Sequence, residues 1–307
     1  MFEVIGLILP VFAVIVAGYA AKRTGFLADG FWAPAEKLGY WVLLPSLIIQ
    51  GLGTNKLPAD WTIFAAAIAA TVVPLSLVML AARRLANWKS AGFASVHQGT
   101  LRLNGLLAIA TCLALIGDAS LPLMGILIAA WVPLSNGLSV YAYVAHRGDD
   151  RARPGQIAVE VVKNPAVFAV IIGATLNVAG LGPALEKFFL FELLGRAALP
   201  IGLLAVGAAL DLSALRRPGP RVMSSLILKM LVMPALMLAI CQALEASPLV
   251  TAVAIICASM PSSPSGYLVA KQLKGDHALM ATIITAQTVV GMITVTAWSV
   301  FALTFLG

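Results

Sequence analysis

Charged residues are scarce in this chain. Only 11% of its 307 residues are Asp, Glu, Lys or Arg, whereas 61% are hydrophobic. A soluble domain typically has about 25% charged and about 45–50% apolar residues, and one domain of this length cannot hide so many apolar residues from water. The shortage of charge therefore excludes a soluble globular protein and favours a chain that lies mostly in a lipid bilayer.

Cysteine and histidine are also rare, with three residues of each. The cysteines lie in separate apolar stretches and form no CxxC or Cys/His cluster, so neither a metal site nor a disulfide framework is predicted. The sequence contains no HExxH motif, P-loop or nucleophile elbow. We therefore expect no enzyme activity, no cofactor and no ATP-driven motor in this chain.

Long hydrophobic runs take up most of the sequence. A helix needs about 20 predominantly apolar residues to cross the hydrocarbon core. Ten segments meet this requirement, and we predict a membrane-spanning helix in each: 3–21, 35–53, 61–82, 93–116, 121–145, 164–181, 191–211, 222–244, 248–270 and 279–305. The fold class is therefore an all-α membrane protein with ten transmembrane helices.

The positive charges predict the orientation of these helices. The connections after odd-numbered segments contain Lys22, Arg23, Lys37, Arg83, Arg84, Lys89, Arg147, Arg151, Arg153, Lys163, Arg216, Arg217, Arg221, Lys271 and Lys274. The even-numbered connections contain only Lys56 and Lys187. Because cytoplasmic loops carry the excess of Lys and Arg, both termini should lie on the non-cytoplasmic side. The net charge of +7 thus reflects topology and does not indicate a nucleic-acid partner.

The first apolar segment differs from a secretory signal peptide. Glu3 precedes the apolar run and Lys22 and Arg23 follow it, which reverses the charge order of a signal peptide. We expect this segment to be the first membrane helix.

Three proline-containing patterns recur along the chain in the same order. The pairs are Pro10 with Pro165, Pro45 with Pro200, and Pro74 with Pro234. Each pair is separated by about 155–160 residues, a spacing typical of an internal repeat of a transporter. We predict a first five-helix repeat at 1–148, a cytoplasmic linker at 149–163 and a second repeat at 164–307. An odd number of spans makes the second repeat inverted, and inverted repeats are typical of secondary transporters.

The ninth segment contains the strongest helix-breaking pattern. Pro261 and Pro264 each remove an amide donor and obstruct the preceding turn, while Ser262, Ser263 and Ser265 can bind freed carbonyls or a ligand. The pattern fits either a kinked packing helix or a broken helix that lines a binding site, because irregular backbone at membrane depth is tolerated only where protein or a cavity surrounds it.

The fourth segment is the counterpart of the ninth in the repeat. It places Arg102 and Asn104 inside an apolar run, just before Gly105. An intramembrane Arg costs at least about 2.5–3.5 kcal/mol, so it should face a partner or a wet cavity. Arg102 can bind a carboxylate in bidentate fashion, or it can extend toward the interface. Asn104 is too short for the second option and is the stronger candidate for the binding site.

Further polar residues lie at membrane depth. Gln50 follows a predicted break at Pro45 and Asn136 follows Pro133, so we expect irregular backbone beside both residues. For Gln50, Asn136 and Gln287, a role in the site competes with ordinary interhelical hydrogen bonding. Three charged residues fall near predicted helix ends, where interfacial positions are expected: Arg196, Asp211 and Lys229.

An ordered set of motifs resembles the auxin efflux carrier family over essentially the whole chain. The motifs are Leu44-Pro45-Ser46-Leu47, Arg102-Leu103-Asn104, Lys163-Asn164-Pro165, Leu199-Pro200-Ile201-Gly202-Leu203 with Gly207, and Met260-Pro261 leading to Ala270 and Gly275-Asp276. The family includes plant auxin carriers and bacterial permeases for malonate and malate, and its fold is similar to that of bile-acid sodium symporters.

The resemblance implies that helices four and nine are broken and cross at the centre, here at Asn104 and Pro261. It also implies an elevator-like movement of a transport domain, often in a dimer. Many family members carry a proline after the asparagine of helix four, whereas this chain has Ile109-Ala110-Thr111, so Gly105 would supply the flexibility.

Together, residues and resemblance predict a secondary transporter of small organic anions in a bacterial inner membrane. The predicted substrate-binding residues are Asn104, Arg102, Pro261, Ser262, Ser263, Ser265, Pro45, Gln50, Asn136 and Gln287. H⁺ or Na⁺ is a candidate coupling ion. The alternatives are a sodium-coupled carrier of larger anions, similar to the bile-acid symporters, and a membrane receptor that does not transport.

Overall fold

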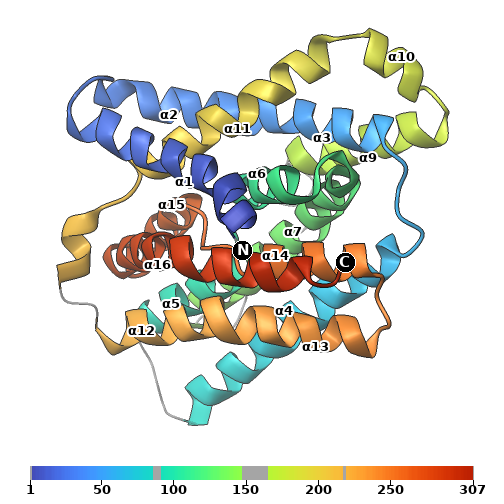
Figure 1. Ribbon diagram of the computed structural model, residues 1–307. Helices are drawn as coiled ribbons and strands as arrows, with labels where there is room; N and C mark the ends of the chain where they lie inside the picture. The colour runs from blue at the N-terminus through green and yellow to red at the C-terminus, as the bar shows by residue number, and fades with distance from the viewer. Residues whose placement is uncertain (1, 86–90, 147–164, 217–218, 307) are drawn as a thin grey trace. The chain divides into compact units, whose positions relative to one another are not determined.

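A computed structural model describes residues 2–85, 91–146, 165–216 and 219–306 (Figure 1). These residues form helices joined by turns, and no strand occurs among them. The chain divides into two compact units, and both units take segments from both halves of the sequence. Unit 1 contains residues 1–62, 105–129 and 161–209, and unit 2 contains residues 63–104, 130–160 and 210–307.

Seven stretches of the described chain are long and apolar enough to cross a bilayer. They are Phe2–Arg23, Trp61–Arg83, Ala91–Ile116, Asp118–Val144, Leu190–Ala208, Pro220–Ala243 and His277–Leu303. The predicted segments 164–181 and 248–270 contain shorter apolar helices, Pro165–Val178 and Pro248–Ala258. The chain is therefore an all-helical, multi-pass integral membrane protein, and the reading of ten spans stays a prediction.

Unit 1 is built from α1, α2, α3, α6, α9, α10 and α11 with the first part of α7. The bounds are α1 Phe2–Arg23, α2 Asp29–Leu38, η1 Gly39–Leu43, α3 Leu44–Thr54, α6 Gly105–Ile116, η2 Asp118–Ser120, α7 Leu121–His146, α9 Pro165–Val178, α10 Gly182–Lys187 and α11 Leu190–Ala208.

Glycines allow the helix backbones of unit 1 to approach closely. Helix α1 lies along α11 (Figure 1), where a methyl group at Gly207 would overlap the carbonyl of Ile15 and one at Gly18 would overlap that of Leu204. Helices α3 and α9 meet in the same manner around Gly173. Close packing through small residues stabilises helix pairs in membranes, where the hydrophobic effect does not bring helices together.

Pro45 widens its helix and does not break it. The preceding residues form a π-helical turn, η1, in which the amide of Leu44 bonds the carbonyl of Gly39. The helix then continues through α3 with Pro45 in its first turn. A proline has no amide for the regular i→i−4 bond, and a single π-helical turn accommodates this loss. The predicted break at Pro45 is therefore wrong, because the backbone remains helical.

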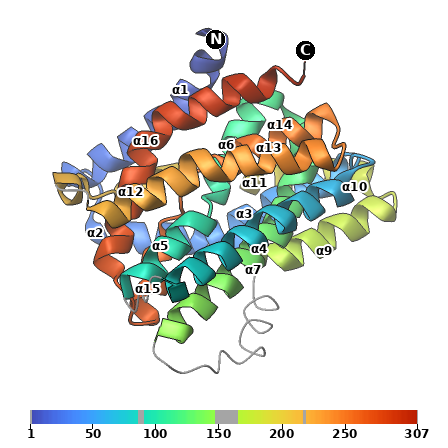
Figure 2. The ribbon, with the colours of Figure 1, turned by 90° about the horizontal axis from the view of Figure 1, so that it is seen from below.

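Unit 2 contains the remaining helices and the second part of α7. The bounds are α4 Trp61–Leu85, α5 Ala91–Leu101, η3 Leu212–Arg216, α12 Pro220–Ile227, η4 Leu228–Val232, α13 Met233–Ala243, α14 Pro248–Ala258, α15 Ser265–Gln272 and α16 His277–Leu303. Helices α12 and α13 continue into each other through the π-helical turn η4, and α12 and η4 lie beside α16 (Figure 2). Helix α14 packs against both α13 and α16.

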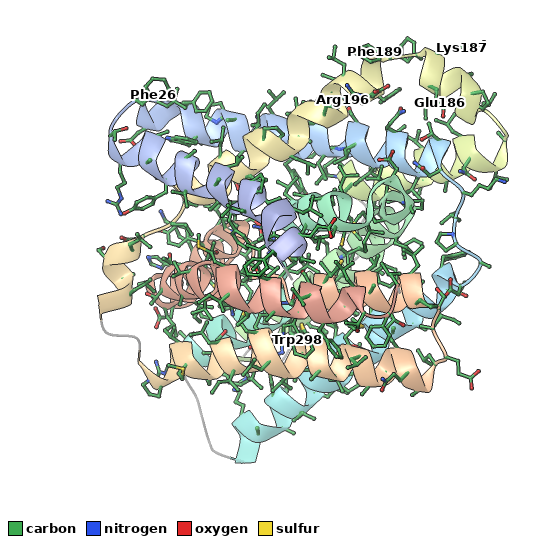
Figure 3. All side chains as sticks on the ribbon, in the orientation of Figure 1. Phe26, Glu186, Lys187, Phe189, Arg196 and Trp298 are labelled. Carbon is green, nitrogen blue, oxygen red and sulfur yellow. The ribbon has the colours of Figure 1, made fainter. Side chains whose placement is uncertain are left out.

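The interior of unit 2 surrounds two short helices. Every residue from Gly92 to Leu101 of α5 is buried, as is every residue from Val250 to Ala258 of α14. Their polar side chains therefore bond within the unit. The elements around these helices also bond one another. The indole of Trp298 in α16 donates to the carbonyl of Met230 in η4 over 2.8 Å (Figure 3).

Candidate functional site

Both helix interruptions that the sequence predicts are present. Helix α5 ends at Leu101 and α6 begins at Gly105, which leaves three residues outside the helix, although no proline follows Asn104 in this segment. Helix α14 ends at Ala258 and α15 begins at Ser265, with Pro261 and Pro264 in the connection.

The carbonyls at the end of α5 are bonded by groups from three parts of unit 2. The last four carbonyls of a helix have no partner within it. Here the bonds are Arg102 N to Gln98 O (2.9 Å), Gln287 Nε2 to Gly99 O (2.9 Å) and Trp131 Nε1 to Leu101 O (2.8 Å). Side chains of α7 and α16 thus stabilise an end that would otherwise leave polar backbone in an apolar interior.

The two interruptions contact each other through the backbone. The amide of Asn104 donates to the carbonyl of Pro261 over 2.7 Å. Gln287 adds a second link, because its Oε1 accepts from the amide of Ser262 over 2.8 Å while its Nε2 donates to Gly99. A buried backbone group needs a partner, so each interrupted segment satisfies polar groups of the other.

Arg102 lies at the amino-terminal end of α15. Its Nη1 donates to Asn136 Oδ1 over 2.8 Å, and its Nη2 donates to Ser265 Oγ over 2.9 Å. Ser265 Oγ is also 2.9 Å from Ser263 Oγ. The amino end of a helix carries a partial positive charge, so a guanidinium and a helix end together create a positive potential at one place. That arrangement attracts an anion.

Unit 2 brings together most of the predicted site residues. Each of these residues bonds another predicted site residue or a residue next to an interruption. They are Arg102, Asn104, Asn136, Pro261, Ser262, Ser263, Ser265 and Gln287. Asn136 reaches Arg102 from a continuous α7, so Pro133 does not create the irregular backbone expected there. The hydroxyl of Ser262 is buried and has no hydrogen-bond partner among the described residues.

Two of the predicted site residues belong to unit 1. Pro45 lies in the first turn of α3, and Gln50 follows it on the same helix. The Oε1 atom of Gln50 is buried and has no hydrogen-bond partner in the described chain. The role of these two residues in the site stays a prediction.

The sequence prediction missed Gln98 and Tyr143. The hydroxyl of Tyr143 donates to Gln98 Oε1 over 2.9 Å, and Gln98 Nε2 is buried with no partner among the described residues. Both Gln98 and Arg102 lie beside Gly266, whose missing side chain would contact them at 3.8 Å and 3.6 Å. The sequence signal that could have identified Gln98 was its spacing from Arg102. Gln98 precedes Arg102 by four residues and therefore lies on the same helix face.

Lys229 occupies a different place from the one expected. Its predicted interfacial position is wrong, because the residue is 0% exposed and lies in η4, inside the stretch Pro220–Ala243. Arg196, in contrast, has a 73% exposed side chain paired with Glu192 one turn away (Figure 3). Asp211 follows the end of α11, as predicted.

Interrupted helices with an arginine beside them are features expected of a membrane transporter. No group of His, Cys, Asp or Glu in the described residues could hold a metal ion. Residues 151–299 match the family described as "Membrane transport protein". This match agrees with the resemblance to the auxin efflux carrier family that the sequence motifs indicate, and the matched family is one of membrane transporters and not of enzymes.

One relative is similar to this chain over nearly the whole length of both proteins. A protein of Rhizobium meliloti (strain 1021) named "Putative malonate transporter" is 24% identical over 319 residues, which cover 95% of this chain and 96% of the relative. The similarity therefore includes both compact units and both interruptions.

Proposed function

We propose that this protein is a secondary transporter of small carboxylates of the malonate class, and that the carboxylate binds where the two interrupted segments meet in unit 2. The observation that carries the proposal is the juxtaposition of Arg102 with the amino-terminal end of α15, beside the bond from Asn104 to Pro261. The name of the relative from Rhizobium meliloti supports malonate as the first substrate to test.

The charge distribution of unit 2 supports an anionic substrate. None of the described helices of unit 2 contains Asp or Glu. Positively charged side chains are present, because Arg102 follows α5 and Lys229 lies in η4. Positive charges at membrane depth are costly and usually mark a substrate or ion pathway. A carboxylate held by Arg102 would supply a negative charge that these helices lack.

Individual side chains can then be given roles. Arg102 would bind one carboxylate group through its guanidinium, and Ser263 and Ser265 would donate hydroxyl hydrogen bonds. The Gln287 side chain would hold the interrupted segments in place, while the side chains of Asn104, Ser262 and Gln98 would offer further polar groups to the substrate. Site residues with fixed partners are preorganised, which reduces the entropy lost on binding.

The helix bounds support two repeats of five spans, 1–148 and 164–307. Helices α5 and α14 both contain 11 residues, and α7 and α16 contain 26 and 27. Each pair is separated by about 155–160 residues, as are the proline patterns. Helices α5 and α14 also share unit 2. The intervening linker, 149–163, lies outside the described residues.

We further propose that transport occurs by an elevator-type movement of unit 2 relative to unit 1. The division into two compact units supports a rigid-body mechanism, and inverted repeats allow the same site to open to either side. The expected setting is a bacterial inner membrane with both termini on the non-cytoplasmic side, and the protein could act as a homodimer.

The decisive experiment is a counterflow assay in proteoliposomes. Vesicles loaded with unlabelled malonate should take up labelled malonate, and Asn104→Ala should abolish this uptake without preventing membrane insertion. Arg102→Lys should raise the half-saturating concentration about tenfold or more, because a hydrogen bond to a charged group contributes about 1.5–3 kcal/mol. The matched control is Arg196→Lys, which changes an exposed arginine.

The outcomes separate the candidate functions. Undiminished uptake by Asn104→Ala would remove this site from consideration. Absence of counterflow for every carboxylate in a panel containing malonate, malate and succinate would favour a receptor. Strict dependence on Na⁺ would favour a sodium-coupled carrier.

A further inference from the structure

Lys229 carries a buried amino group that the proposed site does not use. Its side chain is 0% exposed, and its Nζ lies 3.2 Å from Met233 Sδ and 5.2 Å from the centre of the Trp131 ring. A thioether and an indole face are neutral partners. Within the described chain, no carboxylate lies within ion-pair distance of this ammonium group.

The helix around Lys229 is irregular. Residues Leu228–Val232 form the π-helical turn η4, just before Pro234, and the indole of Trp298 bonds the carbonyl of Met230 in this turn. Single π-helical turns occur often at functional sites. The turn therefore directs a long polar side chain into the interior of unit 2 and is itself held in place by α16.

Titratable groups on the neighbouring elements offer no negative partner. Helices α5, α12, α13 and α16 pack against η4, α14 contributes an electrostatic neighbour, and α7 contributes Trp131. Their titratable residues with described side chains, together with the arginine that follows α5, are His97, Arg102, Arg221, Cys241, Cys257, Tyr141, Tyr143 and His277. Of these, Cys257 interacts electrostatically with Lys229. None is an aspartate or glutamate.

Trp131 connects Lys229 to the interruption. The indole that faces the ammonium group also donates its N–H to the carbonyl of Leu101, the last residue of α5. Arg102 is the next residue in the chain. Lys229 therefore lies one aromatic side chain away from the segment that holds the proposed carboxylate site.

We propose that Lys229 is the proton-binding group that couples proton movement to carboxylate transport, an inference that rests on the proposed function. An unpaired charge is costly to bury, so the charge of Lys229 should depend on whether an anion occupies the neighbouring site. When the carboxylate binds, the amine takes a proton from water on the open side. When the carboxylate leaves on the other side, the ammonium returns that proton to water there, and lysine and anion end the cycle unchanged.

The test separates coupling from exchange. Proteoliposomes in sodium-free choline buffer, with the membrane potential clamped at zero, receive labelled malonate either by counterflow or under a pH gradient of one unit. One proton per turnover predicts accumulation of about tenfold in the wild type, because one pH unit corresponds to a tenfold ratio. Lys229→Met should show measurable exchange and lose accumulation driven by the pH gradient. Lys271→Met, at an exposed lysine of α15, should behave as the wild type.

A binding measurement on the wild type requires no variant. Calorimetric titration with malonate, at a pH where malonate is fully ionised, should show uptake of about one proton per bound anion when buffers of different ionisation enthalpy are compared. Zero proton uptake, or undiminished gradient-driven accumulation by Lys229→Met, would overturn the role of Lys229. Counterflow in the wild type without any effect of the pH gradient would also overturn it, while leaving the proposed function intact. Absence of wild-type counterflow would overturn both.

Discussion

Replacing Gln287 with leucine removes the side chain that links the two interruptions. Gln287 is fully buried, and its amide forms three hydrogen bonds of good geometry: with the amide of Ser262 at 2.8 Å, the carbonyl of Gly99 at 2.9 Å and the hydroxyl of Ser225 at 3.0 Å. Leucine preserves approximate volume and apolar packing but can form none of these bonds. The substitution therefore measures how much the hydrogen bonds of Gln287 contribute to the stability of the folded protein.

The size of the effect follows from what is left unbonded. The hydroxyl oxygen of Ser225, which accepts from Gln287, can rotate toward another donor, whereas the backbone groups of Ser262 and Gly99 are fixed. Each buried group without a partner costs about 1–3 kcal/mol, so for these two groups we expect a loss of about 2–6 kcal/mol. An ordinary interhelical hydrogen bond in a membrane protein averages only about 0.6 kcal/mol. A loss above about 2 kcal/mol would thus mark Gln287 as a support of the interrupted backbone.

Reversible unfolding in mixed micelles, followed by circular dichroism, measures this difference. The matched control is Gln242→Leu, which replaces an exposed glutamine of α13 and should change stability by less than about 0.5 kcal/mol. If Gln287→Leu unfolds at the same denaturant concentration as Gln242→Leu, then the interrupted segments do not depend on this side chain, and the reasoning about their backbone is refuted.

Two further substitutions test the packing of unit 1 and the missed part of the site. Gly207→Ala should prevent correct folding, seen as loss of monodisperse protein, because the added methyl would overlap a carbonyl of α1. Gly6→Ala is the control, because its methyl would enter open space and should not change folding. Normal yield of Gly207→Ala would contradict the close packing of α1 and α11. Tyr143→Phe removes the hydroxyl that fixes the amide of Gln98. The half-saturating concentration of malonate should rise about two- to tenfold, as expected for a hydrogen bond of about 0.5–1.5 kcal/mol. If it equals that of the control variant Tyr141→Phe, the Gln98 amide does not contribute to malonate binding.

Much of the fold could be predicted because hydrocarbon imposes a simple pattern. Long apolar runs predicted helices, and the clusters Pro261–Pro264 and Arg102–Asn104 predicted where two of them stop. Proline content alone was a weaker guide. Pro45 and Pro133 lie within continuous helical backbone, since a π-helical turn or a kink can absorb a missing amide. The interruption after Leu101 forms without a proline, because side chains of α16 and α7 bond the carbonyls that have no partner within α5.

The site was predictable as a set of residue types but not as a set of partners. Arg102 and Ser265 are separated by 163 positions, so only the folded chain shows that they bond. Gln98 and Lys229 were harder to find. A glutamine in a helix usually bonds a neighbouring helix, and a lysine near a predicted segment end usually reaches water. Their burial depends on the packing of α7 and α16, which no local pattern in the sequence reveals.

Protection from thiol labelling tests the central proposal most directly. Ser263→Cys places a thiol beside Ser265 at the proposed site, and Cys112, Cys241 and Cys257 are all buried and should react slowly. Malonate should slow labelling of this thiol in a concentration-dependent manner, whereas neutral malonamide and the exposed control Ser213→Cys should show no such effect. Unchanged labelling at malonate concentrations that saturate counterflow would contradict binding of the carboxylate at the interrupted helices.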